Sequence, residues 1–183
     1  MAGSTANPRI WSLADVYAAP IGTTGPTNIA TALNAGFLPL GLTSEDGFEE
    51  TLDNDVTRHH ARGGILVRTT KSKHQRQIKV TALEENVTVW GLVNPGSGVA
   101  SASGITTRTV KRPTANPMAF VIQETDGSIT RRRYIPRGEV TEVGAVTSND
   151  DQMSMYELTI DIYAAADGTL YLDITDDPQA VPA

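Results

Sequence analysis

The second half of the chain is a succession of short apolar segments separated by turn residues, and no other feature restricts the fold as strongly. From Ile105 onward the segments have the composition of strands, and turn residues lie at 113–117, 126–127, 136–138, 148–151 and 167–168. The Asp126-Gly127 and Asp167-Gly168 pairs are strong hairpin signals, because both residue types tolerate the positive φ of a tight turn. This half of the chain is therefore predicted to be all β.

Residues 156–164 show the most regular alternation in the sequence. Apolar residues occupy positions 158, 160 and 162, and polar residues occupy positions 157, 159 and 161. A period of two is typical of a strand with one buried face and one solvated face. Apolar residues at 170, 172 and 174 predict a neighbouring strand that pairs with it.

The first half of the chain has less regular patterns. Residues 16–19 are strand-like, residues 28–34 predict a small helical piece, and residues 49–64 predict a long loop or a protruding hairpin. Residues 65–70 and 78–82 are predicted strands, with a polar turn at 71–76 between them. Residues 94–104 predict a Gly/Ser loop.

One segment changes its period from two to that of a helix. Apolar residues at 83, 87 and 90 have the i, i+4 and i+7 spacing of an amphipathic helix, although residues 87–89 are also compatible with a strand. Glu84 and Glu85 would lie in the first turn, where the positive end of a helix favours acids. We therefore predict a short helix over residues 84–92.

Together these elements predict a mainly β fold, a β-sandwich or open barrel with one short flanking α-helix. The length of 183 residues fits a single domain over residues 1–183, with an N-terminal arm at 1–14 and a C-terminal tail at 175–183. Trp11 is the candidate residue for docking the arm on a neighbouring copy. Ordinary packing of Trp11 in the core of its own copy is an equally open interpretation.

Composition excludes several classes of protein. The sequence has no cysteine, which excludes disulfides, thiolate metal sites and cysteine nucleophiles. No apolar run approaches the length of about 18 residues that a membrane-spanning helix needs, and the first residues lack the pattern of a secretory signal. We therefore expect no membrane segment and a protein made in the cytoplasm. The formal net charge of −6 argues against a general nucleic-acid-binding protein.

Charge is unevenly distributed along the chain. Residues 45–55 contain six acids and no base, and residues 58–79 contain seven bases and no acid. Two interpretations are open: solvated loops of biased composition, or patches through which one copy contacts another, since charge complementarity fixes the register between partners. The candidate intersubunit residues in these stretches are Glu45, Asp46, Glu49, Glu50, Asp53, Asp55, Arg58, His59, His60 and Arg62.

Three consecutive arginines lie inside a predicted strand. Alternation places Arg131 and Arg133 on one face and Arg132 on the other. A nucleic-acid surface would gather more bases and stacking aromatics on one face, and aromatics make up 5% of this chain. Bidentate pairing with carboxylates of another copy is therefore favoured over nucleic-acid binding, and the three arginines are further candidates for intersubunit contacts.

The residue patterns contain no recognisable active site. His59 and His60 are adjacent, so their side chains diverge in a strand, and His74 lies in a polar turn, whereas metal sites favour spacings such as i, i+4 on a helix. The Gly96-Ser97-Gly98 string lacks the strand and helix that flank a nucleophilic serine. We predict a non-enzymatic protein with no cofactor and no metal.

Three groups of short motifs occur in a characteristic order. The first runs from Val16-Tyr17 through Pro20 and Gly22 to Leu33, Leu40-Gly41 and Ser44-Glu45-Asp46-Gly47. The second is the strand 77–83 that leads into the predicted helix, and the third is the series of tightly turned strands through Leu172. In this order the chain resembles the major tail tube proteins of long-tailed phages, or siphoviruses, especially those of actinobacteria. Residues 58–64 depart from the resemblance, because many relatives are more acidic there and carry a tryptophan.

The resemblance implies a structural virion protein of the phage tail. Six copies would form a homohexameric ring whose inner strands close into a barrel, and stacked rings would form the tube for genome ejection. The implied partners are further copies of the chain, the tape measure and tail terminator proteins, and passing double-stranded DNA that is not specifically bound. Assembly would take place in the host bacterial cytoplasm. On this reading Glu157 and Asp161 are candidates to face the lumen, since bases there would bind phosphates.

Other functions remain open from the sequence. One is a β-sandwich binding module for a carbohydrate or a host surface, which would need exposed aromatics on one sheet face. Another is a different virion component, such as a head decoration protein or a head–tail connector protein. A hydrolase has the least support, because none of the motifs above supplies its catalytic residues.

Overall fold

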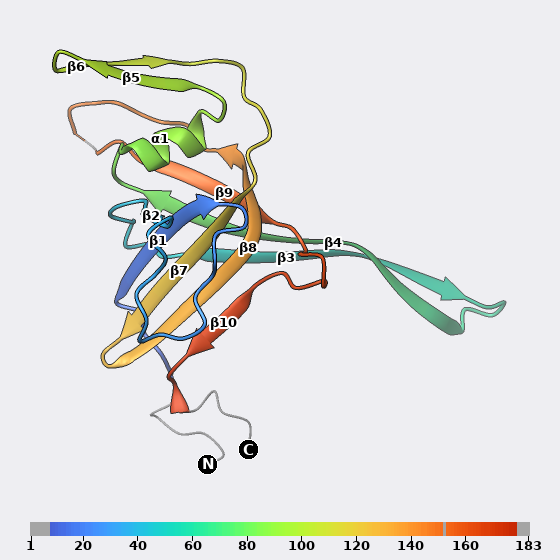
Figure 1. The fold of residues 1–183 in the computed structure, drawn as a ribbon. Coiled ribbons are helices and arrows are strands. Elements are labelled where there is room, and N and C mark those ends of the chain that lie inside the picture. Colours follow the sequence, from blue (N-terminus) through green and yellow to red (C-terminus); the bar gives the residue numbers. More distant parts are fainter. Residues whose placement is uncertain (1–7, 152, 179–183) are drawn as a thin grey trace.

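An antiparallel sheet of eight strands forms most of the computed structural model, which describes residues 8–151 and 153–178 (Figure 1). Neighbouring strands follow the order β2-β1-β7-β8-β9-β4-β3, and β10 pairs with β8 beside this path. The elements are β1 (Leu13–Pro20), β2 (Leu38–Pro39), β3 (Glu49–His60), β4 (Leu66–Ala82), α1 (Val87–Val93), β5 (Gly98–Ala102), β6 (Ile105–Thr109), β7 (Met118–Asp126), β8 (Ile129–Val143), β9 (Tyr156–Ile162) and β10 (Leu172–Thr175). The predicted mainly β fold with one short helix is confirmed.

Strand β8 changes partner along its length. One edge pairs with β7, while the other pairs with β10 at residues 131–134 and with β9 at residues 138–143. The predicted turn at 136–138 is therefore wrong, because β8 runs through it. Pro136 has no N–H to donate, and it lies where β8 has left β10 and has not yet reached β9, so no ladder hydrogen bond is lost there.

The main core lies on one face of this curved sheet. Val80, Phe120, Ile135, Leu158 and Ile160 come from four different strands, and each is 0% exposed. Helix α1 covers this face with its buried residues Val89, Trp90 and Leu92. The alternation predicted for residues 156–162 is confirmed, because the apolar side chains of β9 are buried and the polar ones are not. A sheet that curls around a core and is closed by a helix matches the open-barrel alternative.

The loop at residues 21–37 covers part of the opposite face. Phe37 packs edge to face on Tyr134, with ring centroids 6.3 Å apart, above the buried Ala119 and Val121. A Cβ on Gly25 would lie 2.3 Å from the Tyr134 ring, so glycine is required at this close approach. The predicted helical piece at 28–34 is wrong, because these residues form a series of bends that follows the sheet.

Helix α1 begins later than predicted. Asn86 is the N-cap, and its side-chain Oδ1 accepts a hydrogen bond from the N–H of Val89 at 2.9 Å. Glu84 and Glu85 therefore lie before the helix and not in its first turn. The carboxylate of Glu84 accepts the N–H of Leu42, and Glu85 pairs with Arg108. These contacts tie the residues before the helix to Leu42 and to β6.

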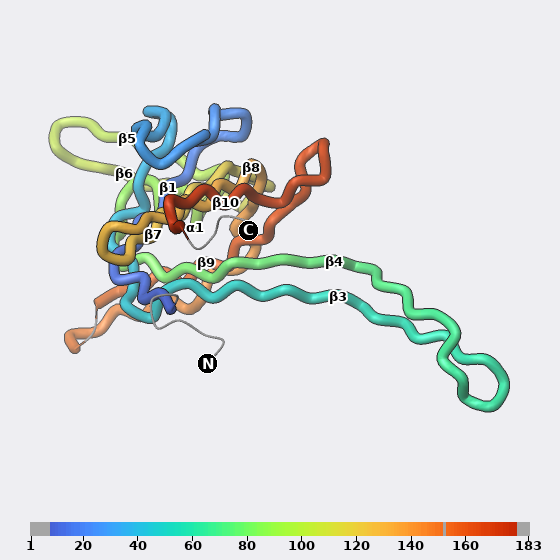
Figure 2. The backbone as a smooth tube through the Cα atoms, turned by 90° about the horizontal axis from the view of Figure 1, so that it is seen from below, coloured from blue at the N-terminus to red at the C-terminus, as the bar shows by residue number. Residues whose placement is uncertain are grey.

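Strands β3 and β4 form a long hairpin, which confirms the protruding-hairpin alternative. The polar turn predicted at 71–76 is wrong, because β4 continues through it with a register shift near Asn54 and a positive φ of 51° at Lys73. Gln77 is the first residue of β4 that pairs with β9, so residues 66–76 pair only with β3 among the described strands. We call residues 52–76 the arm, which is distinct from the predicted N-terminal arm at residues 1–14. The arm extends far from the sheet in both views (Figures 1 and 2).

Two further predictions were wrong. Part of the predicted Gly/Ser loop is strand β5, which forms a separate hairpin with β6 around a turn at Ser103 and Gly104, both of which have positive φ. Strand β10 pairs with β8 and not with β9. The apolar pattern of β10 gave its strand character but not its partner, and Leu172 is 47% exposed.

Replacement of Leu158 by alanine is expected to destabilise the fold by about 2–5 kcal/mol, because it opens a cavity in a fully buried part of the core. The matched variant Leu172→Ala removes the same atoms from an exposed position and is expected to cost at most about 1 kcal/mol. Urea unfolding of the two variants measures both values. Equal losses would contradict the placement of the core.

Candidate functional site

One exposed face of the sheet gathers carboxylates from three strands, β3, β8 and β9. Directly paired residues of antiparallel strands share a face. Asp161 of β9 pairs with Glu139 of β8, and Glu157 pairs with Thr81 of β4. In the next row Glu142, Thr159, Lys79 and Glu49 lie side by side across β8, β9, β4 and β3. We call this surface, opposite the core side chains of β9, the acidic face: Glu49, Glu139, Glu142, Glu157 and Asp161.

The acidic face keeps an excess of negative charge. Lys79 Nζ lies 2.8 Å from Glu157 Oε1, and this hydrogen bond is the main reason why the pKa of Lys79 is raised. The charges of Glu49 and Glu142 raise it further, against the effect of desolvation. Arg137, over the Tyr163 ring at 5.7 Å, is the second base beside this surface. Two bases thus face five carboxylates. The predicted lumen residues Glu157 and Asp161 are both part of this face, and their role stays a prediction.

A charged cluster closes the edge of the core between β3, β8 and β10. Arg133 pairs with Glu50 at 2.6 Å and with Asp173 at 2.8 Å, and its guanidinium lies 4.3 Å from the ring centroid of Tyr171. Burial alone would lower the pKa of Arg133, but the hydrogen bond to Asp173 and the charges of Asp173 and Glu50 outweigh it and raise the pKa. Arg76 also pairs with Glu50, at 3.2 Å. Glu50 and Arg133 therefore have partners within their own copy.

The other two arginines of the triplet also have internal partners. Arg131 donates to Glu124 at 2.5 Å and stacks on the Trp11 ring at 4.5 Å. Trp11 thus holds the segment before β1 against β8. Arg132 is 5% exposed and donates to the side chain of Gln123 and to the carbonyls of Asn28 and Thr31. Arg132 thereby fastens the 21–37 loop to the sheet. A contact of these residues with a second copy stays a prediction.

The remaining candidate residues lie on the arm or close to its base. Glu45 and Asp46 form the turn before β3, where Ser44 Oγ donates to Asp46 at 2.7 Å. Asp55 pairs with Lys73 at 2.7 Å across the hairpin, and Asp53 is exposed. Among the described residues, no carboxylate forms an ion pair with Arg58 or Arg62. The acidic and basic stretches therefore lie on the two strands of one hairpin and partly neutralise each other. An antiparallel hairpin with its turn at residues 61–65 would have indicated this pairing from the sequence.

Two of the three histidines form polar contacts on the arm. His59 Nε2 lies 3.2 Å from Thr70 Oγ1, and His74 Nδ1 lies 2.8 Å from Asn54 Oδ1. His60 lies next to the tip of the arm and pairs with Leu66. No group of three or more potential ligands suited to a metal ion occurs in residues 8–151 and 153–178.

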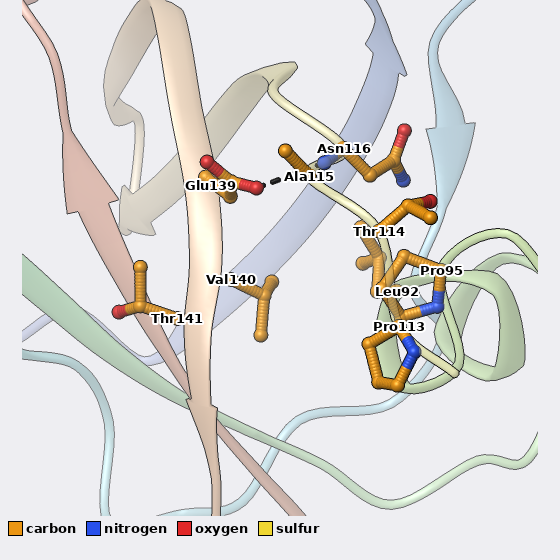
Figure 3. Close-up of a pocket in the computed structure, with 9 residues that line it drawn as sticks. All are labelled: Leu92, Pro95, Pro113, Thr114, Ala115, Asn116, Glu139, Val140 and Thr141. Carbon is orange, nitrogen blue, oxygen red and sulfur yellow. Dashed lines mark hydrogen bonds between the residues drawn. The ribbon is translucent and has the colours of Figure 1, made fainter.

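One hollow of the surface contains few groups suited to chemistry. It has a volume of about 330 Å³ and lies between α1, β8 and the segment at 113–116 (Figure 3). Its polar contact joins the N–H of Asn116 to Glu139 at 2.8 Å, and prolines and aliphatic side chains form much of the wall. This contact fastens the segment before β7 to β8. None of the helices in the described part of the chain has the length and apolarity of a membrane span.

Replacement of Arg132 by lysine is expected to destabilise the protein by about 1–3 kcal/mol, because one ammonium nitrogen with three N–H groups cannot replace the four hydrogen bonds that the guanidinium donates to Gln123, Asn28 and Thr31. The neighbouring variant Arg131→Lys keeps a charge beside Glu124 and is expected to cost at most about 1 kcal/mol. Chemical denaturation measures both losses, and faster hydrogen exchange at Thr31 in the first variant alone would locate the effect. A smaller loss for Arg132→Lys than for Arg131→Lys would contradict the assignment.

Comparisons with known proteins agree with this geometry. No curated protein sequence matches the chain. The PVC sheath/tube terminator of an extracellular contractile injection system, in the extended state, has a similar structure, with a TM-score of 0.50 and 9% identity over 93% of this chain and 99% of that chain. The anti-feeding prophage cap, a tube terminating cap, has a TM-score of 0.50 and 9% identity over 96% of this chain and 95% of that chain. These likenesses show a shared fold.

A family model described as phage tail tube protein matches residues 1–183. The resemblance drawn from the motifs is thereby confirmed, and the chain is placed among structural proteins and not among enzymes. The chain belongs to the phage tail tube protein family, whose members are structural proteins of the virion tail.

Proposed function

We propose that this chain is the major tail tube subunit of a long-tailed phage, and that six copies form a ring which stacks on further rings to make the conduit for genome ejection. The observation that carries this proposal is the acidic face, which is exposed while the opposite face of the same strands is the core. Such a face suits the wall of a channel for a polyanion.

The charge of the acidic face fits a lumen through which DNA moves without being held. Lysines and arginines on the wall would neutralise phosphates and bind the duplex. Five carboxylates with two bases beside them repel phosphates instead, so the duplex meets no strong binding site. On this proposal Glu157 and Asp161 lie in the lumen wall, together with Glu142.

The open edges of the sheet favour closure through neighbouring copies. Strand β3, 12 residues long, ends the sheet on one side, and the two-residue β2 ends it on the other. A long exposed edge invites pairing with another chain, and ring closure removes it. Contacts that join one edge of a copy to a different edge of the next are heterologous, and these generate closed rings or open filaments.

The proposal also implies the partners and the place of assembly. The tape measure protein would occupy the tube before ejection, and a tail terminator protein would end it. Double-stranded DNA would pass without specific binding, and the tube would be assembled in the host bacterial cytoplasm. The two similar solved structures are themselves described as a sheath/tube terminator and a tube terminating cap. This supports a terminator as a partner of related shape.

Electron microscopy of the purified protein tests the proposal. Concentrated protein, with and without the phage's tape measure protein, is expected to form rings and tubes of uniform bore. Sixfold symmetry in end-on class averages would support the ring number. Protein that stays monomeric under both conditions, or rings of another symmetry, would contradict the proposal.

A charge series at one position of the acidic face tests the lumen assignment. Tubes of Glu142→Lys are expected to retain double-stranded DNA, and tubes of the matched neutral variant Glu142→Gln less so, because bases bind phosphates and a neutral amide does not. Wild-type tubes are expected to retain the least. Retention is measured by co-sedimentation of labelled DNA with tubes at low and physiological salt. Equal retention by all three proteins would show that Glu142 does not face the DNA path.

A further inference from the structure

We propose that Lys79 is a masked phosphate-binding residue of the acidic face and that Glu157 is the group that masks it. This inference rests on the proposed function, because it takes the acidic face to be the wall along which DNA moves. It gives Glu157 a role that the other carboxylates of the face do not have. They repel phosphates by their charge, whereas Glu157 occupies a lysine that would otherwise bind them.

Lys79 lies in the middle of the acidic face. Its direct neighbours in the register are Thr159 of β9 on one side and Glu49 of β3 on the other. Thr159 pairs in turn with Glu142 of β8. Glu157 precedes Thr159 by two residues on the same strand, so it is a diagonal neighbour of Lys79, within reach of a long side chain. Carboxylates therefore lie on both sides of the lysine.

The ammonium group of Lys79 is paired with Glu157. Lys79 Nζ lies 2.8 Å from Glu157 Oε1, which is the length of a charge-assisted hydrogen bond. This hydrogen bond is the largest cause of the raised pKa of Lys79, and the charges of Glu157, Glu49 and Glu142 raise it further. Lys79 is therefore charged at neutral pH, and Glu157 compensates the charge locally.

The pair lies at the surface and is not part of the core. The side chain of Lys79 is 41% exposed and that of Glu157 is 47% exposed. Ion pairs with this exposure contribute little to the stability of a fold. Removal of Glu157 would therefore leave the strands in place and make the ammonium group of Lys79 available to a phosphate.

Other carboxylates of the face are held by neutral groups. Gln77 Nε2 donates to Asp161 Oδ1 at 2.7 Å, and the hydroxyl of Tyr163 donates to Glu139 Oε2 at 3.2 Å. A neutral donor orients a carboxylate and leaves its negative charge uncompensated. Glu157 differs from these two residues, because its partner carries a full positive charge.

Gly144 leaves room for the side chain of Glu157. The N–H of Gly144 donates to the carbonyl of Glu157 at 2.8 Å. A Cβ at position 144 would lie 2.9 Å from Glu157 Cβ and 3.4 Å from Glu157 Oε1. Even an alanine would therefore displace the Glu157 side chain. Glycine at this position thus allows Glu157 to take the position from which it reaches Lys79.

An unmasked lysine would be repeated at every level of the proposed tube. Each copy of a ring would present one more ammonium group to the bore, and each further ring would add the same set. Every lysine that contacts a phosphate releases counterions and strengthens binding regardless of sequence. Many such contacts would hold the duplex. Lys79 itself relieves the repulsion among carboxylates on adjacent strands, which like charges placed opposite each other would cause.

A structural link between β4 and β9 is the alternative role of the pair. These strands are already joined along the register from Gln77 and Asp161 to Ala82 and Tyr156. A structural role predicts that loss of the pair lowers stability and leaves DNA binding unchanged. Masking predicts that loss of Glu157 increases DNA binding through Lys79 and leaves stability nearly unchanged.

Neutralisation of Glu157 tests the masking against a matched control on the same face. Glu157→Gln and Glu142→Gln each remove one negative charge, but only the first frees Lys79. Tubes of Glu157→Gln are expected to retain about threefold more double-stranded DNA than tubes of Glu142→Gln, and with a steeper salt dependence, because each freed lysine adds a phosphate contact. Co-sedimentation of labelled DNA with tubes at several salt concentrations measures both quantities.

The same two substitutions in a Lys79→Gln background complete the test. Without the lysine, Glu157→Gln and Glu142→Gln are expected to retain equal amounts of DNA. Arg137 is present in all of these proteins, so its contribution does not affect the comparison. Equal retention by the two single variants would overturn the masking and leave the tail tube proposal intact. A difference that persists without Lys79 would overturn it as well. Absence of wild-type tubes would contradict the proposed function and this role of the pair with it.

Amine reactivity gives a second readout, which needs neither tubes nor DNA. An N-hydroxysuccinimide ester acylates the neutral amine, so a partner that favours the charged form slows the reaction. In the unassembled wild type Lys79 is expected to react severalfold more slowly than the exposed Lys111. Glu157→Gln is expected to remove most of this difference, and Glu142→Gln is expected to keep most of it. Peptide mass spectrometry measures the two lysines in one sample. An unchanged ratio in Glu157→Gln would overturn the masking.

Discussion

The structure depends on the way in which strand β8 shares its two edges among three partners. Its pairing with β7 on one side and with β10 and β9 on the other bends the sheet around the main apolar core. The change of partner at Pro136 lets β9 continue the sheet toward β4, and β4 carries the arm away from the core. Strand β8 therefore positions the main core, the acidic face and the arm, because it belongs to both parts of the sheet.

Charge is segregated between different parts of the molecule. Carboxylates that accompany β9 remain exposed, while arginines on β8 are held by partners such as Glu50 and Glu124 within the copy. Among the described residues, Arg58, Arg62, Arg68 and Lys71 on the outer part of the arm form no ion pair. On the proposed function, contacts with further copies of the chain would cover the open sheet edges of a subunit with an acidic face and a basic arm.

Much of the β architecture was predictable from local pattern, and the errors have physical causes. The alternation in β9 and the Asp126-Gly127 turn report local geometry, so the burial of β9 and the β7–β8 hairpin were predicted correctly. Partner choice is not local, which is why β10 was assigned to the wrong neighbour. The arginine triplet had the expected alternation, but its partners come from β3, β7, β10 and a distant loop. The turn predicted at residues 71–76 failed because polar composition is also typical of a strand exposed on both faces.

A cryo-electron microscopy reconstruction of assembled tubes, at a resolution that shows side chains, tests the account most directly. The account predicts six copies in each ring and the carboxylates of β8 and β9 on the wall of the bore. A map with another number of copies in each ring, or one in which the acidic face lies on the outer surface, would contradict it.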